Sequence, residues 1–326
     1  MPPGWHRLSP VKSVASGLPG RSWNARCRTA GVGFAALVTE ALGGKFVPVT
    51  VTGPLGDPVA AYYGRAGDTG VLDAASACGL SLVPPCRRNP SLTTSRGVGE
   101  LMAAACRAGC RKLLVGLGGT STCDGGEGMM EAASPFRGLV SVDVLCDVDN
   151  PFTGPRGAAR VFAPQKGADP AMVERLEERM VRRAARILAE TGVDVSALPG
   201  AGAAGGLAGA LAACFGARMV PGIDAVLGYV DFAGKCTDAG LVITGEGCSD
   251  RQTLSGKVPT GVLRRSGDVP VVLMSGRIRD REALLEAGFA ETVTVSPAGQ
   301  PLAEALLPAV AVRNLRAATA RLLSGF

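Results

Sequence analysis

The sequence predicts an α/β protein with largely parallel sheets, organised as two domains. Short runs rich in Val, Ile and Leu alternate with longer segments of helical periodicity, which is typical of strands that helices cover on both faces. The chain has 326 residues, more than one typical domain, and its 47% apolar content can fill a sizeable core. The same composition excludes a generally disordered chain.

The expected elements follow in order from Gly33, since residues 1–30 show no clear period of either kind. The first is a helix whose apolar residues recur at helical spacing and which ends at Gly43-Gly44. Strands are expected over residues 45–51, 112–117, 142–147, 240–244, 269–274 and 292–295. Further helices are expected over residues 99–108, 171–190, 202–215, 260–265, 281–287 and 302–323.

The helix expected over 171–190 carries the clearest local signals. Asp169 can cap its amino end, and Pro170 suits its first turn. One apolar stripe runs along it, formed by Val173, Leu176, Met180, Ala184, Ile187 and Leu188. The many Arg and Glu residues between them are expected to form its solvated face.

Composition excludes several classes of function. The only histidine is His6, which rules out a Ser-His-Asp triad and a histidine metal site. The ten cysteines form no C-x-x-C pair and lie mostly in apolar segments, so buried thiols are expected. The net charge of +6 is spread without a lysine-rich tract, which argues against a nucleic-acid surface.

Neither a membrane span nor a secretion signal is expected. The longest uncharged stretch, residues 198–217, is too rich in glycine to be stable in lipid. Prolines and Lys12 interrupt the opening residues, which therefore lack the apolar core of a signal peptide. We expect a soluble, cytoplasmic protein with no membrane partner.

The first of four polar, glycine-rich segments directly follows the strand expected at 112–117. It contains the run Gly118-Gly119-Thr120-Ser121, in which glycines let backbone N–H groups approach phosphate oxygens and hydroxyls add donors. Asp124, further along, is a candidate metal ligand or proton acceptor. The alternative is a tight turn in which Asp124 caps a helix.

The second segment follows the strand expected at 142–147. Asp147, Asp149 and Asn150 offer oxygen atoms at positions i, i+2 and i+3, which suit a magnesium ion that keeps some of its waters. An Asx turn is the alternative. Lys166 lies on a turn downstream, where a lysine suits a phosphate or carboxylate contact.

The third segment, residues 199–208, includes Gly202 and Gly205. It can be a small-residue helix packed very close to a neighbour, or a backbone cradle for an anion. It follows no clear strand, so it is not a convincing dinucleotide-binding fingerprint.

The fourth segment follows the strand expected at 240–244. Glu246, Asp250 and Lys257 share one polar loop there, at the crevice where open α/β sheets bind ligands. A standard P-loop is excluded, because Lys257 is followed by Val258 rather than by Ser or Thr.

Taken together and in order, these segments identify a resemblance to a known family. The carriers are residues 118–126, 146–151, 164–168, 199–206 and 243–257, with lesser matches at 51–56 and 89–95. In this order the chain resembles the bacterial, type-1 family of glycerate kinases from about Gly33 to its carboxyl end. A single segment can arise by chance, but the ordered set is highly specific.

The resemblance implies ATP-dependent phosphorylation of D-glycerate to phosphoglycerate, with Mg²⁺. It also implies two α/β domains: a flavodoxin-like domain with a parallel sheet built from residues 1–46 and 225–326, and an inserted domain of residues 47–224. Self-association is compatible with the family.

With the resemblance, the candidate residues acquire expected roles. Since the chain has no usable histidine, Asp124 or Asp147 would act as the base, and the two stay open as alternatives. Lys166 and Lys257 would bind phosphate or the substrate carboxylate. Nucleotide contacts would fall to Gly118, Gly119, Thr120, Ser121, Gly202, Gly205 and Lys257. Magnesium contacts would fall to Asp149, Glu246 and Asp250.

Two stretches depart from the family pattern. Members usually open with a strand and an Asp-Ser-Phe-Lys segment, followed by Asp-Gly-Gly-Glu-Gly-Thr before the helix that begins here near Gly33; residues 1–30 contain neither. We interpret this as an altered reading frame or decayed gene start, rather than divergence with a replacement strand at 11–15. Such a change would remove a strand and an acidic ligand. The connection from Met130 to Ser141 is also shorter than usual.

Two other functions remain open at this point. A catalytically inactive family member would keep a pocket for an organic acid or nucleotide, and the missing acidic segment favours it. A different small-molecule kinase acting on a hydroxy acid is the third hypothesis. The sequence does not show whether the 2- or the 3-hydroxyl of glycerate is used.

Overall fold

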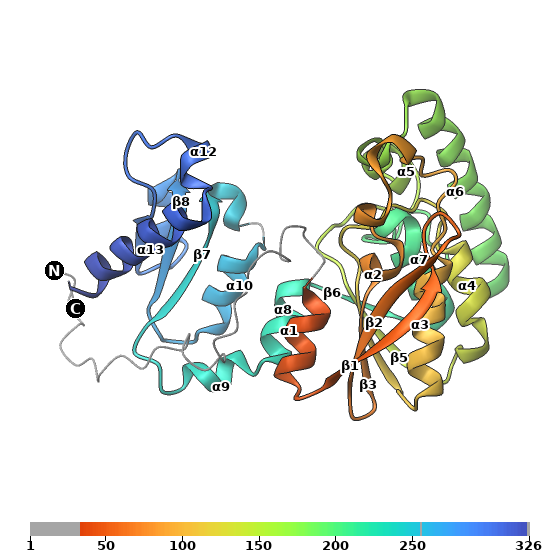
Figure 1. Ribbon diagram of the computed structural model, residues 1–326, viewed down its shortest axis with the longest axis horizontal. Coiled ribbons are helices and arrows are strands. Elements are labelled where there is room, and N and C mark those ends of the chain that lie inside the picture. The colour runs from red at the N-terminus through yellow and green to blue at the C-terminus, as the bar shows by residue number, and fades with distance from the viewer. Residues whose placement is uncertain (1–32, 255, 325–326) are drawn as a thin grey trace. The chain divides into compact units, whose positions relative to one another are not determined.

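The computed structural model describes residues 33–254 and 256–324, which divide into two compact units, 33–226 and 227–324 (Figure 1). Each unit combines a sheet with helices, which confirms the predicted α/β class. The expected features of residues 1–30, including a replacement strand at 11–15, lie outside the described residues.

The larger unit contains a six-stranded sheet in the order β1-β2-β3-β4-β5-β6. The strands are β1 (Lys45–Thr52), β2 (Pro58–Ala66), β3 (Thr69–Asp73), β4 (Lys112–Gly116), β5 (Ser141–Leu145) and β6 (Arg218–Val220). The first two pairings are antiparallel and the other three are parallel, so this sheet is mixed rather than largely parallel. The expected strands omit β2, β3 and β6. The alternation rule missed β2 and β3 because they form hairpins without intervening helices, and β6 has only three residues.

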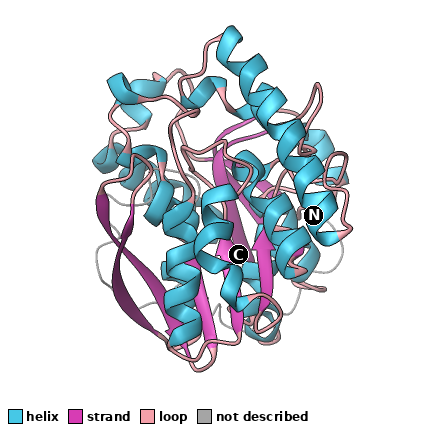
Figure 2. Cartoon of the chain, turned by 90° about the vertical axis from the view of Figure 1, so that its right-hand side faces the viewer, coloured by secondary structure: helices cyan, strands magenta, loops and turns pink. Residues whose placement is uncertain are grey.

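Helices pack against this sheet and bury a continuous apolar core (Figure 2). Leu72, Leu113 and Val115 of neighbouring strands are fully buried, as is Leu101 of a covering helix. The helices are α1 (Phe34–Ala41), α2 (Ala74–Cys78), α3 (Arg96–Arg107), α4 (Glu127–Ala133), α5 (Ala158–Phe162), α6 (Pro170–Thr191), α7 (Leu207–Phe215) and α8 (Gly222–Tyr229).

Helix α6 forms as its sequence predicts. The Asp169 carboxylate accepts a hydrogen bond from Met172 N at 2.7 Å and caps the first turn. The predicted apolar stripe is buried except for Leu188, which is 44% exposed and does not belong to it. The prediction of a wholly solvated charged face is also wrong, because Arg183 is only 6% exposed.

Helix α1 is attached to the larger unit by a buried carboxylate, Asp73, at the end of β3. Its oxygens accept hydrogen bonds of 3.3 Å from the backbone N–H groups of Gly33 and Ala35, so Asp73 caps a helix nearly 40 residues away in sequence. Contacts of α1 with β2 and β3 place residues 34–41 in this unit. The domain boundaries that the resemblance implies, 1–46 with 225–326 and 47–224, stay a prediction.

The described part of the smaller unit has a three-stranded parallel sheet in the order β7-β8-β9. Its strands are β7 (Val242–Ser249), β8 (Val271–Ile278) and β9 (Glu291–Thr294). Helices α9 (Phe232–Cys236), α10 (Val258–Arg265), α11 (Arg281–Glu286), α12 (Leu302–Ala305) and α13 (Pro308–Leu323) accompany them. Val272, Met274 and Ala318 form part of its buried core.

Two expectations from composition are tested by the described residues. All nine cysteines among them are free thiols, and six of the nine are buried. None of the helices in the described ranges combines the length and the apolar character that a bilayer crossing requires.

The buried Asp73 predicts an unusual dependence of stability on pH. Burial raises the pKa of its carboxyl group from 3.8 to about 7, although the two backbone hydrogen bonds lower it. The folded state therefore binds the proton more tightly, and the free energy of unfolding should fall as pH rises from about 4 to about 7, by on the order of 4 kcal/mol. Asn also caps helices but carries no charge.

We therefore expect Asp73→Asn to be more stable than the wild type at pH 8 and nearly equal to it at pH 4. Urea unfolding at both pH values measures the difference. An equal stability gap at the two pH values would show that the charge of Asp73 does not oppose folding.

Candidate functional site

A cavity of about 450 Å³ lies in the larger unit, at the carboxyl ends of β4 and β5. The two strands are parallel neighbours, so the loops that follow them meet at one edge of the sheet. The lining residues come from the end of β5, the loops after β4 and β5, the turn after α2, α5 and its following turn, and the segment 199–208. They are Leu80, Leu117, Gly118, Gly119, Thr120, Leu145, Cys146, Asp147, Val148, Phe162, Gln165, Lys166, Ala203 and Ala204.

Lys166 supplies a buried positive charge to this cavity. The residue is 4% exposed, and its Nζ donates to the Thr122 carbonyl at 2.7 Å and to Thr120 Oγ1 at 3.5 Å. Burial lowers the pKa of the ammonium group, while nearby Cys123, Cys78 and Asp124 act in the opposite direction. No carboxylate of a described residue forms an ion pair with Lys166, so the charge is available to an anionic ligand.

Asp147 lines the same cavity with an exposed carboxylate. Its Oδ1 accepts a hydrogen bond of 2.7 Å from Gly222 N, which fixes the side chain. A Cβ atom at Gly222 would lie 2.9 Å from Asp147 Oδ2, so glycine leaves room for this carboxylate. Of the two expected alternatives for the base, Asp147 is the one that faces the cavity.

The loop after β4 brings Gly118, Gly119 and Thr120 to the cavity wall. Gly119 has a φ of 76°, a conformation that favours glycine, and its carbonyl accepts from Leu80 N at 2.8 Å. Ser121 does not line the cavity, because its Oγ donates to the Cys78 carbonyl at 2.9 Å. Ser121 thus fastens this loop to the end of α2.

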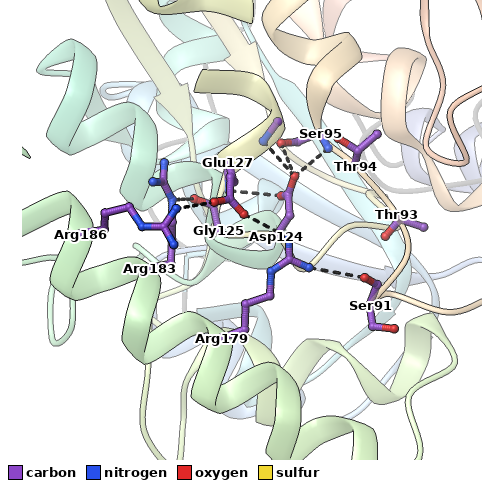
Figure 3. Close-up of polar contacts among 12 residues, drawn as sticks. Ser91, Thr93, Thr94, Ser95, Asp124, Gly125, Glu127, Arg179, Arg183 and Arg186 are labelled. Atoms are coloured by element: carbon purple, nitrogen blue, oxygen red, sulfur yellow. Dashed lines mark hydrogen bonds and ion pairs between the residues drawn. The ribbon is translucent and has the colours of Figure 1, made fainter. Parts of the chain in front are cut away.

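Asp124 occupies the centre of a buried hydrogen-bond network outside the cavity lining (Figure 3). Its Oδ2 accepts from Ser95 N at 2.8 Å, from Ser95 Oγ at 2.7 Å and from Gly128 N at 3.3 Å, while Oδ1 accepts from Gly126 N at 3.2 Å. The residue is 3% exposed. This geometry matches the helix-cap alternative and leaves little capacity to accept a substrate proton.

Arginines of α6 surround Glu127, the first residue of α4 (Figure 3). Arg179 and Arg186 form ion pairs with its two carboxylate oxygens at 3.2 and 2.7 Å. Although burial raises the pKa of Glu127, the hydrogen bond from Arg179 and the nearby arginines hold it below its usual value. Arg179 also donates to the Ser91 carbonyl, so the cluster links α6, α4 and the loop that carries Ser95.

Gly202 and Gly205 serve close packing rather than the cavity lining. A Cβ atom on Gly202 would lie 2.2 Å from the Pro151 carbonyl oxygen, and one on Gly205 would lie 2.0 Å from that of Thr122. Neither residue lines the cavity, although Ala203 and Ala204 between them do. This geometry fits the closely packed alternative for the segment.

Asp149 lies on the surface, with its side chain 72% exposed. Its Oδ1 pairs with Arg156 at 2.7 Å, and this hydrogen bond lowers the pKa of the carboxylate. Asp149 is not among the residues that line the cavity, whereas the neighbouring Asp147 is.

The remaining candidates lie together in the smaller unit, at the end of β7. Glu246 Oε1 accepts from Thr253 Oγ1 at 2.5 Å and from Ser249 Oγ at 3.1 Å, and Lys257 Nζ is 4.0 Å from Glu246 Oε2. Asp250 Oδ1 accepts from Gln252 N at 2.9 Å and forms an Asx turn. Within residues 33–254 and 256–324, no group of three or more His, Cys, Asp or Glu side chains is arranged to hold a metal ion.

Comparison with known proteins now decides the family. The model of the glycerate kinase family matches residues 27–135 and 134–325, which is most of the chain. The chain belongs to the glycerate kinase family. The two matched segments meet at residues 134–135, within the Met130–Ser141 connection.

Named members of the glycerate kinase family are similar over most of their length. The glycerate kinase of Bacillus subtilis is 41% identical over 310 residues, covering 84% of this chain and 81% of the relative. Glycerate 2-kinase of Escherichia coli is 40% identical over 264 residues, covering 71% and 69%. A crystal structure of a candidate glycerate kinase 2 from Salmonella typhimurium LT2 has a TM-score of 0.76 and 36% identity, covering 91% of this chain and 87% of that one.

Sequence reasoning missed some of the residues that line this cavity. Phe162 and Leu80 line the cavity, but apolar residues in short helices carry no signal for it. Sequence reasoning also missed Asp73, which caps α1 and lies outside the cavity lining, although the sequence places an acidic residue at the end of an apolar strand there. Ser95 was part of a minor motif, and only the fold brings it to Asp124.

The Asp124 network predicts a structural phenotype. Replacing Asp124 by Asn removes a charged acceptor from buried donors, so we expect the free energy of unfolding to fall by about 1–3 kcal/mol. Urea unfolding measures this free energy. Asp147→Asn is the matched control, and its free energy of unfolding should decrease much less. Normal stability together with abolished turnover in Asp124→Asn would instead make Asp124 the base.

Proposed function

We propose that this protein transfers the terminal phosphoryl group of ATP to a hydroxyl group of D-glycerate and releases phosphoglycerate and ADP. The observation that carries the proposal is the buried, unpaired ammonium of Lys166 in the same cavity as the exposed carboxylate of Asp147. Membership of the glycerate kinase family supplies the reaction class and ATP as the phosphoryl donor.

Each group in the cavity has a chemical task in this proposal. The Lys166 ammonium binds the glycerate carboxylate and holds the substrate in one orientation. The Asp147 carboxylate accepts the proton of the attacking hydroxyl group, since the described residues include no histidine. The Gly118–Thr120 loop, which lines the cavity, is proposed to supply backbone N–H groups that stabilise the charge of the phosphoryl group.

Phosphoryl transfer depends mainly on positioning and charge neutralisation, so a short list of fixed groups is sufficient. Asp124, Ser121, Gly202 and Gly205 contribute by holding the cavity loops in place. Their proposed role is structural support rather than contact with the reacting atoms.

Magnesium enters the proposal with the nucleotide. A magnesium ion held by ATP phosphates needs only one or two protein carboxylates, which fits sites without a preformed cluster. Glu246 and Asp250, together at the end of β7, are the proposed carboxylates, with exposed Asp149 as a further candidate. When bound, the ion neutralises charge on the β- and γ-phosphates.

Two finer features are also proposals. The 40% identity to a glycerate 2-kinase favours the 2-hydroxyl as the acceptor. We also propose that the protein acts in the cytoplasm, where ATP is supplied. No observation on the described residues favours the inactive binding protein over the kinase.

A coupled assay of ADP release with D-glycerate, ATP and Mg²⁺ tests the function. We expect turnover by the wild type and a decrease in kcat of about 10²–10⁴-fold in Asp147→Asn, with little change in the glycerate KM, because the base acts in the transition state. Product analysis then distinguishes 2-phosphoglycerate from 3-phosphoglycerate.

The matched control for this assay is Asp194→Asn, which changes an exposed carboxylate outside the cavity lining and outside the proposed magnesium contacts. A wild-type protein that binds glycerate but releases no ADP would contradict the kinase function. Equal turnover in Asp147→Asn and the wild type would contradict only the proposed role of Asp147 as the base, and not the kinase function.

A further inference from the structure

We propose that the smaller unit binds the adenine nucleotide in a cavity at the carboxyl ends of its parallel strands, an inference that rests on the kinase function proposed above. The cavity has a volume of about 330 Å³, at the lower end of the range for ligand pockets. Its floor comes from Gly247 of β7, Gly276 of β8 and Val295 after β9. Carboxyl ends of parallel strands are where open α/β sheets bind ligands.

The walls of this cavity are apolar and suit a flat heterocyclic base. Helices α12 and α13, labelled near β8 in Figure 1, contribute Leu302, Ala305 and Ala311, and Leu306 comes from the connection between them. A Cβ atom at Gly276 would lie 2.6 Å from the Gly247 carbonyl oxygen, so the floor is bare backbone by necessity. Glycerate is a small polar anion and gains nothing from such walls, whereas a purine ring does.

One buried amide gives the cavity a defined hydrogen-bonding polarity. Asn314 lines it and is 7% exposed. The Glu304 carboxylate can only accept hydrogen bonds, and its Oε1 accepts one of 3.0 Å from Gln300 Nε2. This fixes the Gln300 amide so that its Oε1 accepts a hydrogen bond of 2.7 Å from Asn314 Nδ2. Asn314 Oδ1 is left as an acceptor to which no described residue donates. That acceptor matches the exocyclic amine of adenine and opposes the carbonyl oxygen of guanine.

Two arginines provide the positive charge that a nucleotide's phosphates require. Arg277 and Arg279 line both this cavity and an adjoining hollow of about 480 Å³. Arg277 donates to the Gln300 carbonyl at 3.5 Å, while the Arg279 guanidinium has no hydrogen bond or ion pair with any described side chain or backbone group. The base would therefore lie on Asn314 and the phosphates beside Arg279.

Equilibrium binding of ADP to the full chain, without glycerate, tests the proposal by calorimetry. Asn314→Leu removes the acceptor at similar volume, and we expect ADP to bind about tenfold more weakly. Arg279→Gln should weaken the binding of ADP by about tenfold but leave the affinity for adenosine unchanged, since adenosine has no phosphate. The matched control is Arg316→Gln, an exposed α13 arginine outside both lining sets, which should bind ADP as the wild type does.

Glu304 acts as a positioning residue, and its role has a separate readout. In Glu304→Gln, the amide at position 304 can also donate a hydrogen bond. The amides of Gln300 and Asn314 can then turn over, so that Asn314 presents its Nδ2 to the cavity instead of its Oδ1. We expect the preference for ADP over GDP to decrease several-fold while the affinity for ADP changes less. If Glu304 had a purely structural role, Glu304→Gln would weaken the binding of ADP and GDP equally.

The result that overturns the proposal is unchanged ADP affinity in Arg279→Gln and Asn314→Leu, or no ADP binding by the wild type. Since Arg279 is exposed, Arg279→Gln remains informative even if Asn314→Leu does not fold. ADP binding that follows the prediction in a protein without glycerate turnover would reject the proposed function alone. Glycerate turnover with an unchanged ATP KM in both variants would reject this nucleotide site alone.

Discussion

The larger unit depends on a buried positive charge, that of Lys166, which forms no ion pair with a carboxylate of a described residue. Enclosing an unpaired lysine ammonium costs on the order of several kcal/mol, which hydrogen bonds to Thr122 and Thr120 offset only in part. A ligand anion can supply the missing countercharge, so the fold holds Lys166 ready for binding at the expense of stability. The cavity loops must then be rigid, because they cannot relax to solvate the charge.

That rigidity comes from groups around the cavity that face away from it. Asp124 joins the Ser95 loop to the amino end of α4, Ser121 fastens the glycine loop to α2, and Glu127 is clamped by the arginines of α6. The smaller unit presents a different chemistry at its own sheet edge, with apolar walls, one oriented amide and two arginines. This difference fits the proposal that the two edges bind different substrates of one transfer reaction.

The sequence predicted most of the architecture but less of the site. Periodicity located α6 and the parallel strands β4, β5, β7, β8 and β9, because a buried strand and an amphipathic helix each have a characteristic local residue pattern. The β2–β3 hairpin was missed because its pairing depends on turns rather than on composition. Motifs singled out Lys166 and Asp147, which line one cavity, yet gave Asp124 the same status as Asp147. Burial and hydrogen-bond partners separate those two carboxylates, and both depend on residues distant in sequence such as Ser95.

The most direct test of the buried ammonium is the affinity for D-glycerate in the absence of nucleotide, measured by calorimetry on the wild type and on Lys166→Met. Methionine fills similar space without a charge, so the fold should remain and its free energy of unfolding should not decrease. The account predicts that glycerate binds at least tenfold more weakly to Lys166→Met, the cost of one lost charge-assisted contact. Equal affinity in the two folded proteins would contradict it.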